Sequence, residues 1–392
     1  MSKRSVHEEH NHNDSYFPTA LWYVRRVNSL KNKRFSPKTR LLLPLVMVFF
    51  GACIDLELPN LSSQWGTGPT DGPYCNPDQI ETHPAETLRI HVIDIGQGDA
   101  IWIETPWYTD KALESRNIIV DTGPIEQSGI LLDYLFTRGL TPGSQIDALI
   151  VSHAHADHYG GVIPLVENFD VLRYVDPGYA ASSTQFLEAR NVALLEVVAF
   201  GGSPETPAIP GLASNLFQNV NLFGPEVTSQ ILWGREQPLG GAGSSSNAAT
   251  NNTSVVLSLQ YGGIRVLLMG DAEKEVEAEL LAQPANVNLK ANILKVGHHG
   301  SDSSSTADFL DRVFPFPSEA DYAIISSGRK SFGGAQLPNE GTVSRLKALL
   351  GTYHVLSTEN RDELKSSGDE AGDDHIIITI DASSQTEACY AP

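Results

Sequence analysis

Apolar and polar residues alternate over many short stretches of this chain, and elsewhere apolar residues recur at helical spacing. Alternation predicts strands, because successive side chains of a strand face opposite sides. The predicted strands cover residues 88–95, 99–104, 117–120, 146–151, 254–260, 264–269, 292–296, 322–326 and 375–380. Helical spacing predicts helices over residues 129–138, 272–282 and 340–350. Between residues 181 and 240 the pattern weakens, and we expect loops and edge strands there.

Strands arrive first in hairpins and then alternate with helices, and this sequence of elements occurs twice. We therefore expect an α/β fold (α+β in four layers), in which two mixed β-sheets pack together and helices flank both outer faces. The expected parts are a leader over residues 1–53, a flexible Pro/Gly/Ser-rich tether over 54–86, one folded domain over 87–383 and a C-terminal tail over 384–392. Residues 240–247 predict a flexible loop, either a surface insertion or a border of the functional site.

The leader has the parts of a secretory signal. Basic residues over 31–40 precede an apolar run over 41–50, which is short for a bilayer span, and then Gly51-Ala52-Cys53. The last three residues resemble the lipobox of bacterial lipoproteins, which implies lipidation of Cys53, although Phe50 stands where leucine is usual. We expect an extracytoplasmic lipoprotein of the bacterial cell envelope, in the periplasm or on the outer surface, with its lipid in the membrane. A cleaved signal without lipid and an uncleaved anchor are the alternatives.

Charge and cysteine content limit the possible partners. The 392 residues include 27 Lys and Arg and 47 Asp and Glu, a formal charge of −20. Such a surface opposes sequence-independent binding to DNA or anionic membranes, which relies on clustered basic side chains. A phosphate substrate is still allowed, because bound metal ions would dominate the local charge of a cleft. Once Cys53 carries lipid, Cys75 and Cys389 remain, and they could pair in an oxidising compartment or stay as two buried thiols.

Three histidines and an aspartate crowd into the segment Ser152-His153-Ala154-His155-Ala156-Asp157-His158, directly after a predicted strand. In extended chain, His153 and His155 face the same side and can hold one ion. Asp157 and His158 follow where the chain turns, so they can face a second site. Imidazole with carboxylate suits zinc, or manganese and iron where oxygen ligands dominate. A solvated polar loop is the alternative.

Two more clusters stand at the ends of predicted strands. Asp271 follows Gly270 after the strand over 264–269, and His298-His299 lie between two glycines after the strand over 292–296. The glycines allow sharp turns and close approach to a ligand. Either cluster alone carries little information. Both together, after the histidine segment and in this order, indicate one metal centre.

These residues resemble the metallo-β-lactamase fold superfamily, and specifically the extracytoplasmic domain of ComEC competence proteins and its freestanding relatives. The matching segments are residues 92–100, 152–161, 252–271, 294–301 and 324–328, and the resemblance runs from about Leu88 to Ile380. It implies the αββα sandwich of that superfamily. The segments are much more specific for the fold than for the substrate.

The resemblance implies two divalent metal ions, with Zn²⁺ favoured and Mn²⁺ as the alternative. The implied metal ligands are His153, His155, Asp157, His158, Asp271 and His299. His153 and His155 would hold one ion, Asp157, His158 and His299 the other, and Asp271 would bridge them. His298 would then act on substrate or in proton transfer, unless it exchanges roles with His299.

Further residues are implied around the metals. Asp157 and His298 are the candidate catalytic residues, and Asp94, Asn252 and Ser301 would support the ligands or contact substrate. In particular, we expect Asp94 to orient the histidine segment from outside the ligand set.

Three departures from the resemblance matter. Asn251-Asn252 stand where the superfamily commonly has a third histidine, which predicts a weaker first site. Leu337 precedes Pro338 where ComEC domains tend to have histidine, which leaves nuclease activity in question. His155 is a full histidine where ComEC proteins often have aspartate, and this favours a well-formed binuclear centre.

The sequence therefore predicts an exported, binuclear, metal-dependent hydrolase. Its expected substrate is an anionic phosphodiester, either nucleic acid or a phospho-substituted envelope component or small molecule. The alternatives are a carboxylic ester, lactone or β-lactam hydrolase, which the same metal-activated water could serve, and a non-catalytic surface binding lipoprotein. No protein partner can be inferred.

Overall fold

The computed structural model describes residues 73–76, 80, 83–110, 113–179, 182–202, 218–219, 221–237, 239, 246–283, 287–328, 331–332, 335–359 and 371–391. The predicted leader with Cys53, the first part of the tether and most of the predicted loop over 240–247 lie outside these residues. None of the helices within them has the length and apolar character that a bilayer crossing requires.

The first large sheet has seven strands. Its spatial order is β18 (Thr386–Ala391), β17 (His375–Asp381), β1 (Thr87–Val92), β2 (Ala100–Glu104), β3 (Asn117–Thr122), β5 (Ala148–Ile150) and β7 (Tyr174–Val175). Neighbours from β18 to β3 pair antiparallel, and β3, β5 and β7 run parallel. The sheet is therefore mixed, as expected, and its parallel strands end on the edge from which the histidine segment leaves.

The second large sheet also has seven strands. Its order is β16 (Val355–Ser357), β13 (Tyr322–Ile325), β12 (Ile293–Lys295), β11 (Ile264–Leu268), β10 (Val256–Tyr261), β9 (Thr228–Trp233) and β8 (Gln218–Asn219). Strands β11, β12, β13 and β16 run parallel, and the others pair antiparallel. Two small ladders join β4 (Gln145–Ile146) to β6 (Asp170–Val171) and β14 (Ser331–Phe332) to β15 (Ala335–Gln336).

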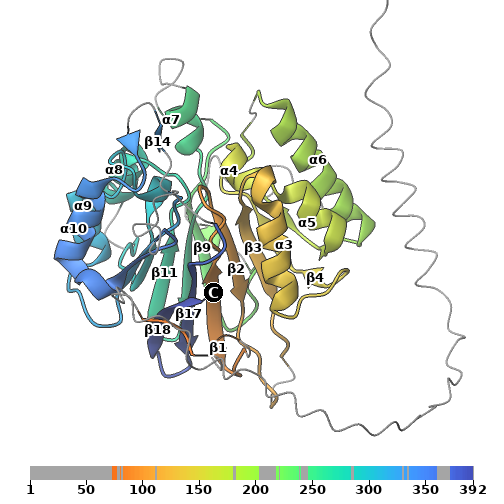
Figure 1. Ribbon diagram of the computed structural model, residues 1–392, viewed down its shortest axis with the longest axis horizontal. Helices are drawn as coiled ribbons and strands as arrows, with labels where there is room; N and C mark the ends of the chain where they lie inside the picture. The colour runs from red at the N-terminus through yellow and green to blue at the C-terminus, as the bar shows by residue number, and fades with distance from the viewer. Residues whose placement is uncertain are drawn as a thin grey trace, which may run out of the picture. The chain divides into compact units, whose positions relative to one another are not determined.

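Helices cover both sheets on their outer faces (Figure 1). Those over the first sheet are α3 (Ser128–Thr137), α5 (Val162–Asn168) and α6 (Thr184–Ala199), with the short η2 (Ile125–Gln127) and α4 (Ala156–Tyr159) nearby. Those over the second sheet are α8 (Lys274–Leu281), α9 (Ala307–Val313) and α10 (Glu340–Leu350). The remaining helical segments are α7 (Ser246–Asn251), η4 (Gly297–Gly300) and η5 (Thr352–His354). The four-layer αββα arrangement that the sequence predicted is confirmed.

Because successive side chains of a strand face opposite sides, each sheet contributes side chains to two hydrophobic cores. Ile101 and Ile103 of β2 face the core between the sheets, whereas Trp102 between them faces the helices. In β10, Leu257 lies in the central core and Val256 in the core under α8, α9 and α10. Both faces of each sheet are therefore buried, which is why these strands are apolar on both sides.

The segment after residue 181 contains a long helix, whereas the sequence led us to expect only loops and edge strands. Residues 184–199 form α6, which begins where the Ser183 hydroxyl caps the Phe186 N–H. Its buried side includes Phe186, Ala193 and Val197, while Leu195 and Val198 are exposed. Because apolar residues lie on both sides of this helix, its amphipathic pattern is weak, and the sequence pattern did not predict it. Before residue 240, β8 is the edge strand of the second sheet, and β9 lies inside the sheet between β8 and β10.

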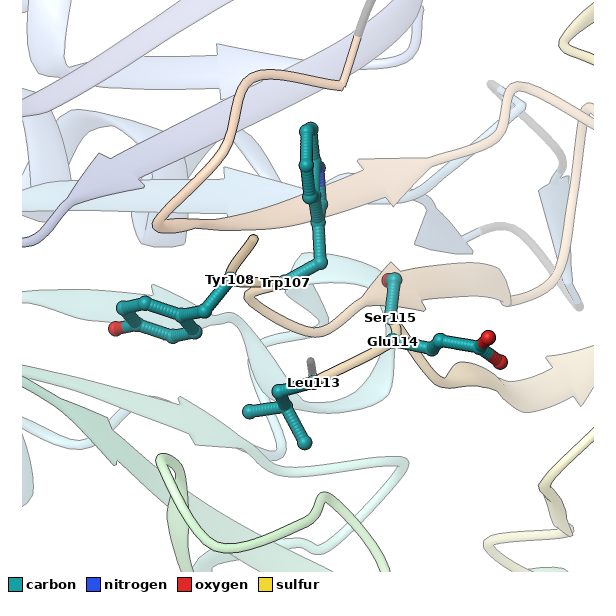
Figure 2. Close-up of a pocket in the computed structure, with 5 residues that line it drawn as sticks. All are labelled: Trp107, Tyr108, Leu113, Glu114 and Ser115. Atoms are coloured by element: carbon teal, nitrogen blue, oxygen red, sulfur yellow. The ribbon is translucent and has the colours of Figure 1, made fainter. Parts of the chain in front are cut away.

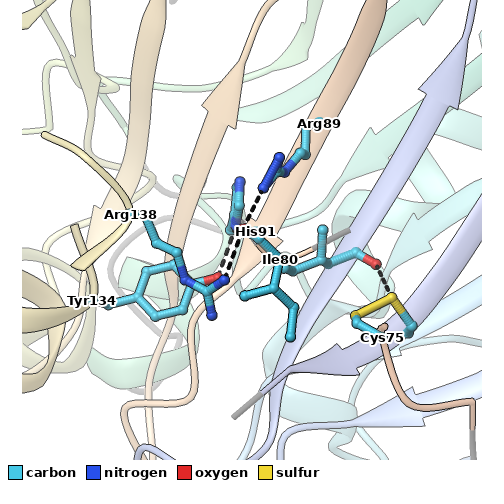
Figure 3. The surroundings of a disulfide bond; sticks show 8 residues. Cys75, Ile80, Arg89, His91, Tyr134 and Arg138 are labelled. Carbon is cyan, nitrogen blue, oxygen red and sulfur yellow. Dashed lines mark hydrogen bonds between the residues drawn. A yellow bond between two sulfur atoms is a disulfide. The ribbon is translucent and has the colours of Figure 1, made fainter. Parts of the chain in front are cut away.

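The two ends of the domain are joined by a disulfide between Cys75 and Cys389, whose Cα atoms are 5.0 Å apart (Figure 3). The Cys75 N–H donates to the Tyr390 carbonyl, and Arg89 and Arg138 both donate to the carbonyl of Ile80. The last residues of the expected tether are thus attached to the domain. The expected tail over 384–392 requires correction as well, because residues 386–391 form edge strand β18.

Candidate metal centre

The predicted ligands lie at the strand ends of both sheets. The histidine segment leaves β5, Asp271 follows β11, and η4 with His298 and His299 follows β12. The Val255 N–H donates to the Ser152 carbonyl at 2.9 Å, and the His298 N–H donates to the Gly270 carbonyl at 3.1 Å. These backbone contacts bring the three segments together at one end of the sandwich.

Backbone geometry allows the segments to approach closely. Gly270 has a φ of +54°, and a Cβ added there would lie 3.0 Å from the Ser152 Cβ. A Cβ added to Gly98, with a φ of +137°, would lie 2.4 Å from the Asp157 carbonyl oxygen. His298 and His299 also have positive φ, 47° and 53°. Left-handed backbone at two consecutive non-glycine residues costs about 1–3 kcal/mol for each and is typical of functional sites.

Three imidazoles converge on one carboxylate oxygen. The Asp271 Oδ2 lies 3.3 Å from the Nε2 of His158, 3.4 Å from that of His299 and 3.7 Å from that of His153. All four residues are buried. Asp271 therefore lies between the two groups of ligands that the sequence predicted.

The first group consists of His153, His155 and Asp271, and the second of Asp157, His158 and His299. Within each group one potential ligand atom of every residue lies within 4.8 Å of the others. The His153 Nε2 is 3.0 Å from the His155 Nδ1, and the His158 Nε2 is 3.3 Å from the His299 Nε2. The structure thus brings together all six residues that the sequence predicted as ligands.

The three buried histidines are held through their Nδ1 atoms, so that their Nε2 atoms face the other ligands. The His158 Nδ1 donates to Asp121 Oδ2 at 2.8 Å, and the His299 Nδ1 donates to the Ser326 carbonyl at 3.0 Å. The His153 Nδ1 donates to the Ser152 hydroxyl, which itself donates to Asp121. A hydrogen bond at Nδ1 fixes the tautomer and leaves the Nε2 lone pair exposed.

This arrangement fits metal ions. Three nitrogen lone pairs and a carboxylate oxygen face one another, so positive charge is needed between them. The Asp271 Oδ1 is also buried and has no hydrogen-bond partner among the described residues. Imidazole nitrogen with carboxylate oxygen is a donor set that zinc accepts. The residues present therefore suit divalent cations.

The pKa directions agree with this need for positive charge. Burial alone would lower the pKa of His158 and His299, but Asp271 together with the other nearby carboxylates, Asp121 for His158 and Asp157 and Asp99 for His299, raises both well above the usual value. Burial of Asp271 is likewise outweighed by His299 and His158, which lower its pKa. The centre is built to hold cations, and binding of metal would displace protons from it.

Two aspartates that the sequence analysis did not single out orient the ligands. Asp121 accepts from His158 and from the N–H and hydroxyl of Ser152. Asp99 Oδ1 lies 3.4 Å from the His299 Nδ1, and its Oδ2 lies 2.9 Å from the Lys295 Nζ. Asp99 lies within the matching segment 92–100, and Asp121 directly follows the predicted strand over 117–120. In the sequence, these positions were the only indications that the two aspartates belong to the metal centre.

Asp94 does not have the role that we expected. Its carboxylate accepts hydrogen bonds from the backbone N–H groups of Gly96, Gly372, Asp373 and Asp374. Asp94 therefore fixes the chain that leads into β17, and among the described residues its recorded partners do not include the histidine segment. Asp121 instead orients His158 through a hydrogen bond, and Asp99 lies 3.4 Å from the His299 Nδ1.

Asn252 and Ser301 support the site indirectly. The Asn252 Oδ1 accepts from the Glu273 N–H at 3.0 Å, and its Nδ2 donates to Glu275 at 3.3 Å. Ser301 accepts at its Oγ from Ser303, which in turn contacts the Nδ1 of His298 at 2.8 Å. Asn252 thus holds the chain beyond Asp271, and Ser301 acts on His298 through Ser303.

His298 lies beside the ligand groups. Its side chain is 24% exposed, and its Nδ1 is 3.4 Å from Glu273 Oε1. The ligand groups among the described residues contain His299 and do not contain His298. This placement suits the substrate or proton-transfer role that the sequence favoured for His298.

A separate hollow of about 370 Å³ lies at the connection between β2 and β3 (Figure 2). Its lining residues are Trp107, Tyr108, Leu113, Glu114 and Ser115. It contains none of the predicted site residues, and Glu114 is the only carboxylate in its lining. We therefore do not assign the metal chemistry to this hollow.

Comparison with known proteins agrees with the geometry. Residues 95–315 match the family model described as the metallo-beta-lactamase superfamily. ComE operon protein 3 of Bacillus subtilis (strain 168) is 30% identical over 261 residues, covering 62% of this chain and 29% of that protein. Competence protein ComA of Neisseria gonorrhoeae is 26% identical over 270 residues, covering 68% of this chain and 31% of that protein.

Among solved structures, the metallo-beta-lactamase fold protein YhfI from Bacillus subtilis aligns with a TM-score of 0.38 and 14% identity. The alignment covers 69% of this chain and 96% of YhfI. The chain spans less than a third of the length of the two curated relatives.

Proposed function

Because this chain belongs to the metallo-β-lactamase superfamily, we propose that it is a metal-dependent hydrolase of a phosphodiester. The observation that carries the proposal is the convergence of His153, His158 and His299 on the Oδ2 of Asp271. Two divalent ions, when bound, lower the pKa of a water molecule and neutralise the negative charge that develops on phosphorus-bound oxygens. We propose Zn²⁺ as the resident metal, with Mn²⁺ as the alternative.

The two groups of residues have different roles in the proposed reaction. The first group would hold one ion and the second group the other, with Asp271 between the two groups. Asp157, with a side chain 28% exposed, is the most open carboxylate of the groups. Burial would raise its pKa, but the hydrogen bond from His299 and the charge of His158 outweigh it and lower the pKa. Asp157 therefore stays ionised and can orient the attacking water by accepting its hydrogen bond.

His298 is the residue that we assign to the substrate. Its exposed imidazole lies next to the first group, and Ser303 and Glu273 hold its Nδ1. An imidazole fixed in this way can contact a phosphate oxygen or donate a proton to the leaving oxygen.

One observation favours a second candidate, hydrolysis of a carboxylic ester or lactone. Leu337, where the resemblance leads us to expect histidine, is buried, and the following Pro338 lies against Gly300 of η4. An apolar side chain there gives no hydrogen bond to a phosphate. The metal-activated water could attack a carbonyl carbon equally well.

A substrate panel separates the two candidates. We expect the purified domain to hydrolyse bis-p-nitrophenyl phosphate, and to lose that activity after chelation and regain it with Zn²⁺ or Mn²⁺. The same preparations are assayed with p-nitrophenyl acetate and nitrocefin. A Glu114→Gln variant, altered only in the separate hollow, is the control. Ester turnover without phosphodiester turnover would contradict the phosphodiester proposal.

We also propose that the domain works outside the cytoplasm and is anchored through lipid on Cys53. The disulfide between Cys75 and Cys389 supports this proposal, because such bonds persist in oxidising compartments. Cell fractionation tests it: the full chain should be found with membranes and a Cys53→Ala variant should not. An unchanged membrane fraction for the variant would rule out the lipid anchor.

A further inference from the structure

Asn251 is buried next to the first ligand group. It is the last residue of α7, its exposed fraction is 2%, and its Nδ2 lies 3.4 Å from the His298 Nε2. Its carbonyl accepts from the Ser254 N–H, and the Ser254 hydroxyl accepts from the Asp271 N–H. Asn251 thus lies at the side of the first group.

The orientation of the Asn251 amide follows from its neighbour. Its Nδ2 donates to the Glu273 Oε1 at 2.7 Å. The reverse orientation would place the amide oxygen against a carboxylate oxygen, which is repulsive. The Oδ1 must therefore point away from Glu273. It is buried there and accepts no hydrogen bond from any described residue. A buried carbonyl oxygen of this kind is costly unless it has a partner.

The neighbouring asparagine provides a contrast. Both polar atoms of the Asn252 side chain are engaged, with the Glu273 N–H and with Glu275. Asn252 therefore has no need of a further partner, whereas the Asn251 Oδ1 does. The two adjacent asparagines have different roles.

We infer that the Asn251 Oδ1 is a third protein ligand, beside His153 and His155, for the ion of the first group. The inference rests on the proposed binuclear centre. Asn251 contributes a neutral carboxamide oxygen where the second group has the carboxylate of Asp157. The first ion is therefore held with one less negative charge and more weakly than the second. The two ions should bind one after the other.

Metal titration of the variants tests the assignment without any activity assay. Calorimetric titration of the metal-free domain with Zn²⁺, combined with metal analysis after gel filtration, should give two ions of unequal affinity for the wild-type chain. Asn251→Ala should weaken the lower-affinity ion by more than about 10-fold, the lower bound for losing a residue that only orients a ligand. The tighter ion should be unaffected.

Two further variants keep the test decisive. Asn251→His offers a nitrogen ligand and an N–H for Glu273, so it should retain or strengthen the weaker ion. Asn247→Ala, which alters an exposed asparagine of the same helix α7, is the matched control and should leave both affinities unchanged. The assignment is overturned if Asn251→Ala changes neither affinity, or if Asn247→Ala weakens the same ion equally. Circular dichroism of each metal-free variant checks that it folds.

The outcomes also separate this assignment from the proposed function. A wild-type chain that binds fewer than two ions contradicts the binuclear centre itself. A chain that binds two ions and hydrolyses no phosphodiester loses the proposed function, while the Asn251 assignment is judged by the titrations alone.

Discussion

Asp271→Asn should lower kcat/KM for the phosphodiester by more than about 100-fold, the upper end of the loss caused by removing a residue that only orients a metal ligand. Asp271 Oδ2 faces three imidazole nitrogens at 3.3–3.7 Å. Asparagine has nearly the same shape but removes the negative charge on which both ions depend. Steady-state kinetics at saturating metal measures the change.

The matched control for this variant is Asp302→Asn, which alters an exposed aspartate in the loop after η4. Its kcat/KM should stay within a factor of about 2, because exposed polar substitutions have small effects. An Asp271→Asn variant with kinetics like those of the control would show that Asp271 does not hold the metals.

Lys295→Met should lower the free energy of unfolding by about 3–5 kcal/mol, because it leaves a buried charge without its partner. Lys295 and Asp99 are each 1% exposed, and their Nζ and Oδ2 atoms are 2.9 Å apart. Burial opposes ionisation of Asp99, but the charge of Lys295, together with His299 and His158, outweighs it and lowers the pKa of that carboxyl. Without Lys295, the Asp99 carboxylate would keep only the contact with the His299 Nδ1 at 3.4 Å to offset the cost of burying its charge.

Urea unfolding of the metal-free domain measures this loss. Lys290→Met is the control, since Lys290 is exposed and precedes the same strand, and its unfolding free energy should change by less than about 0.5 kcal/mol. If Lys295→Met and Lys290→Met unfold at the same urea concentration, the buried ion pair does not stabilise the fold.

The six candidate metal ligands could be recognised in the sequence because their signal is local. His153, His155, Asp157 and His158 are neighbours in sequence, and Asp271 and His299 each end an apolar strand. The strands themselves were visible because both sheets have long runs of alternating or continuous apolar residues. Parallel strands then bring their ends to one edge, so a correct strand pattern predicted the site as well.

The residues that support the ligands could not be predicted in the same way. Asp99 and Asp121 are single carboxylates whose partners, Lys295 and His158, lie far along the chain. The family resemblance assigned Asp94 to the histidine segment, but its carboxylate accepts from backbone N–H groups of Gly96 and of residues 372–374. The fold decides such pairings, and no short motif records them.

The most direct test of the central claim is anomalous diffraction from crystals of the zinc-loaded domain. We expect two zinc peaks, one between His153, His155 and Asp271 and the other between Asp157, His158 and His299, with Asp271 adjoining both. Data collected on either side of the zinc absorption edge identify the element. A single peak, no peak, or zinc bound away from these residues would contradict the binuclear centre.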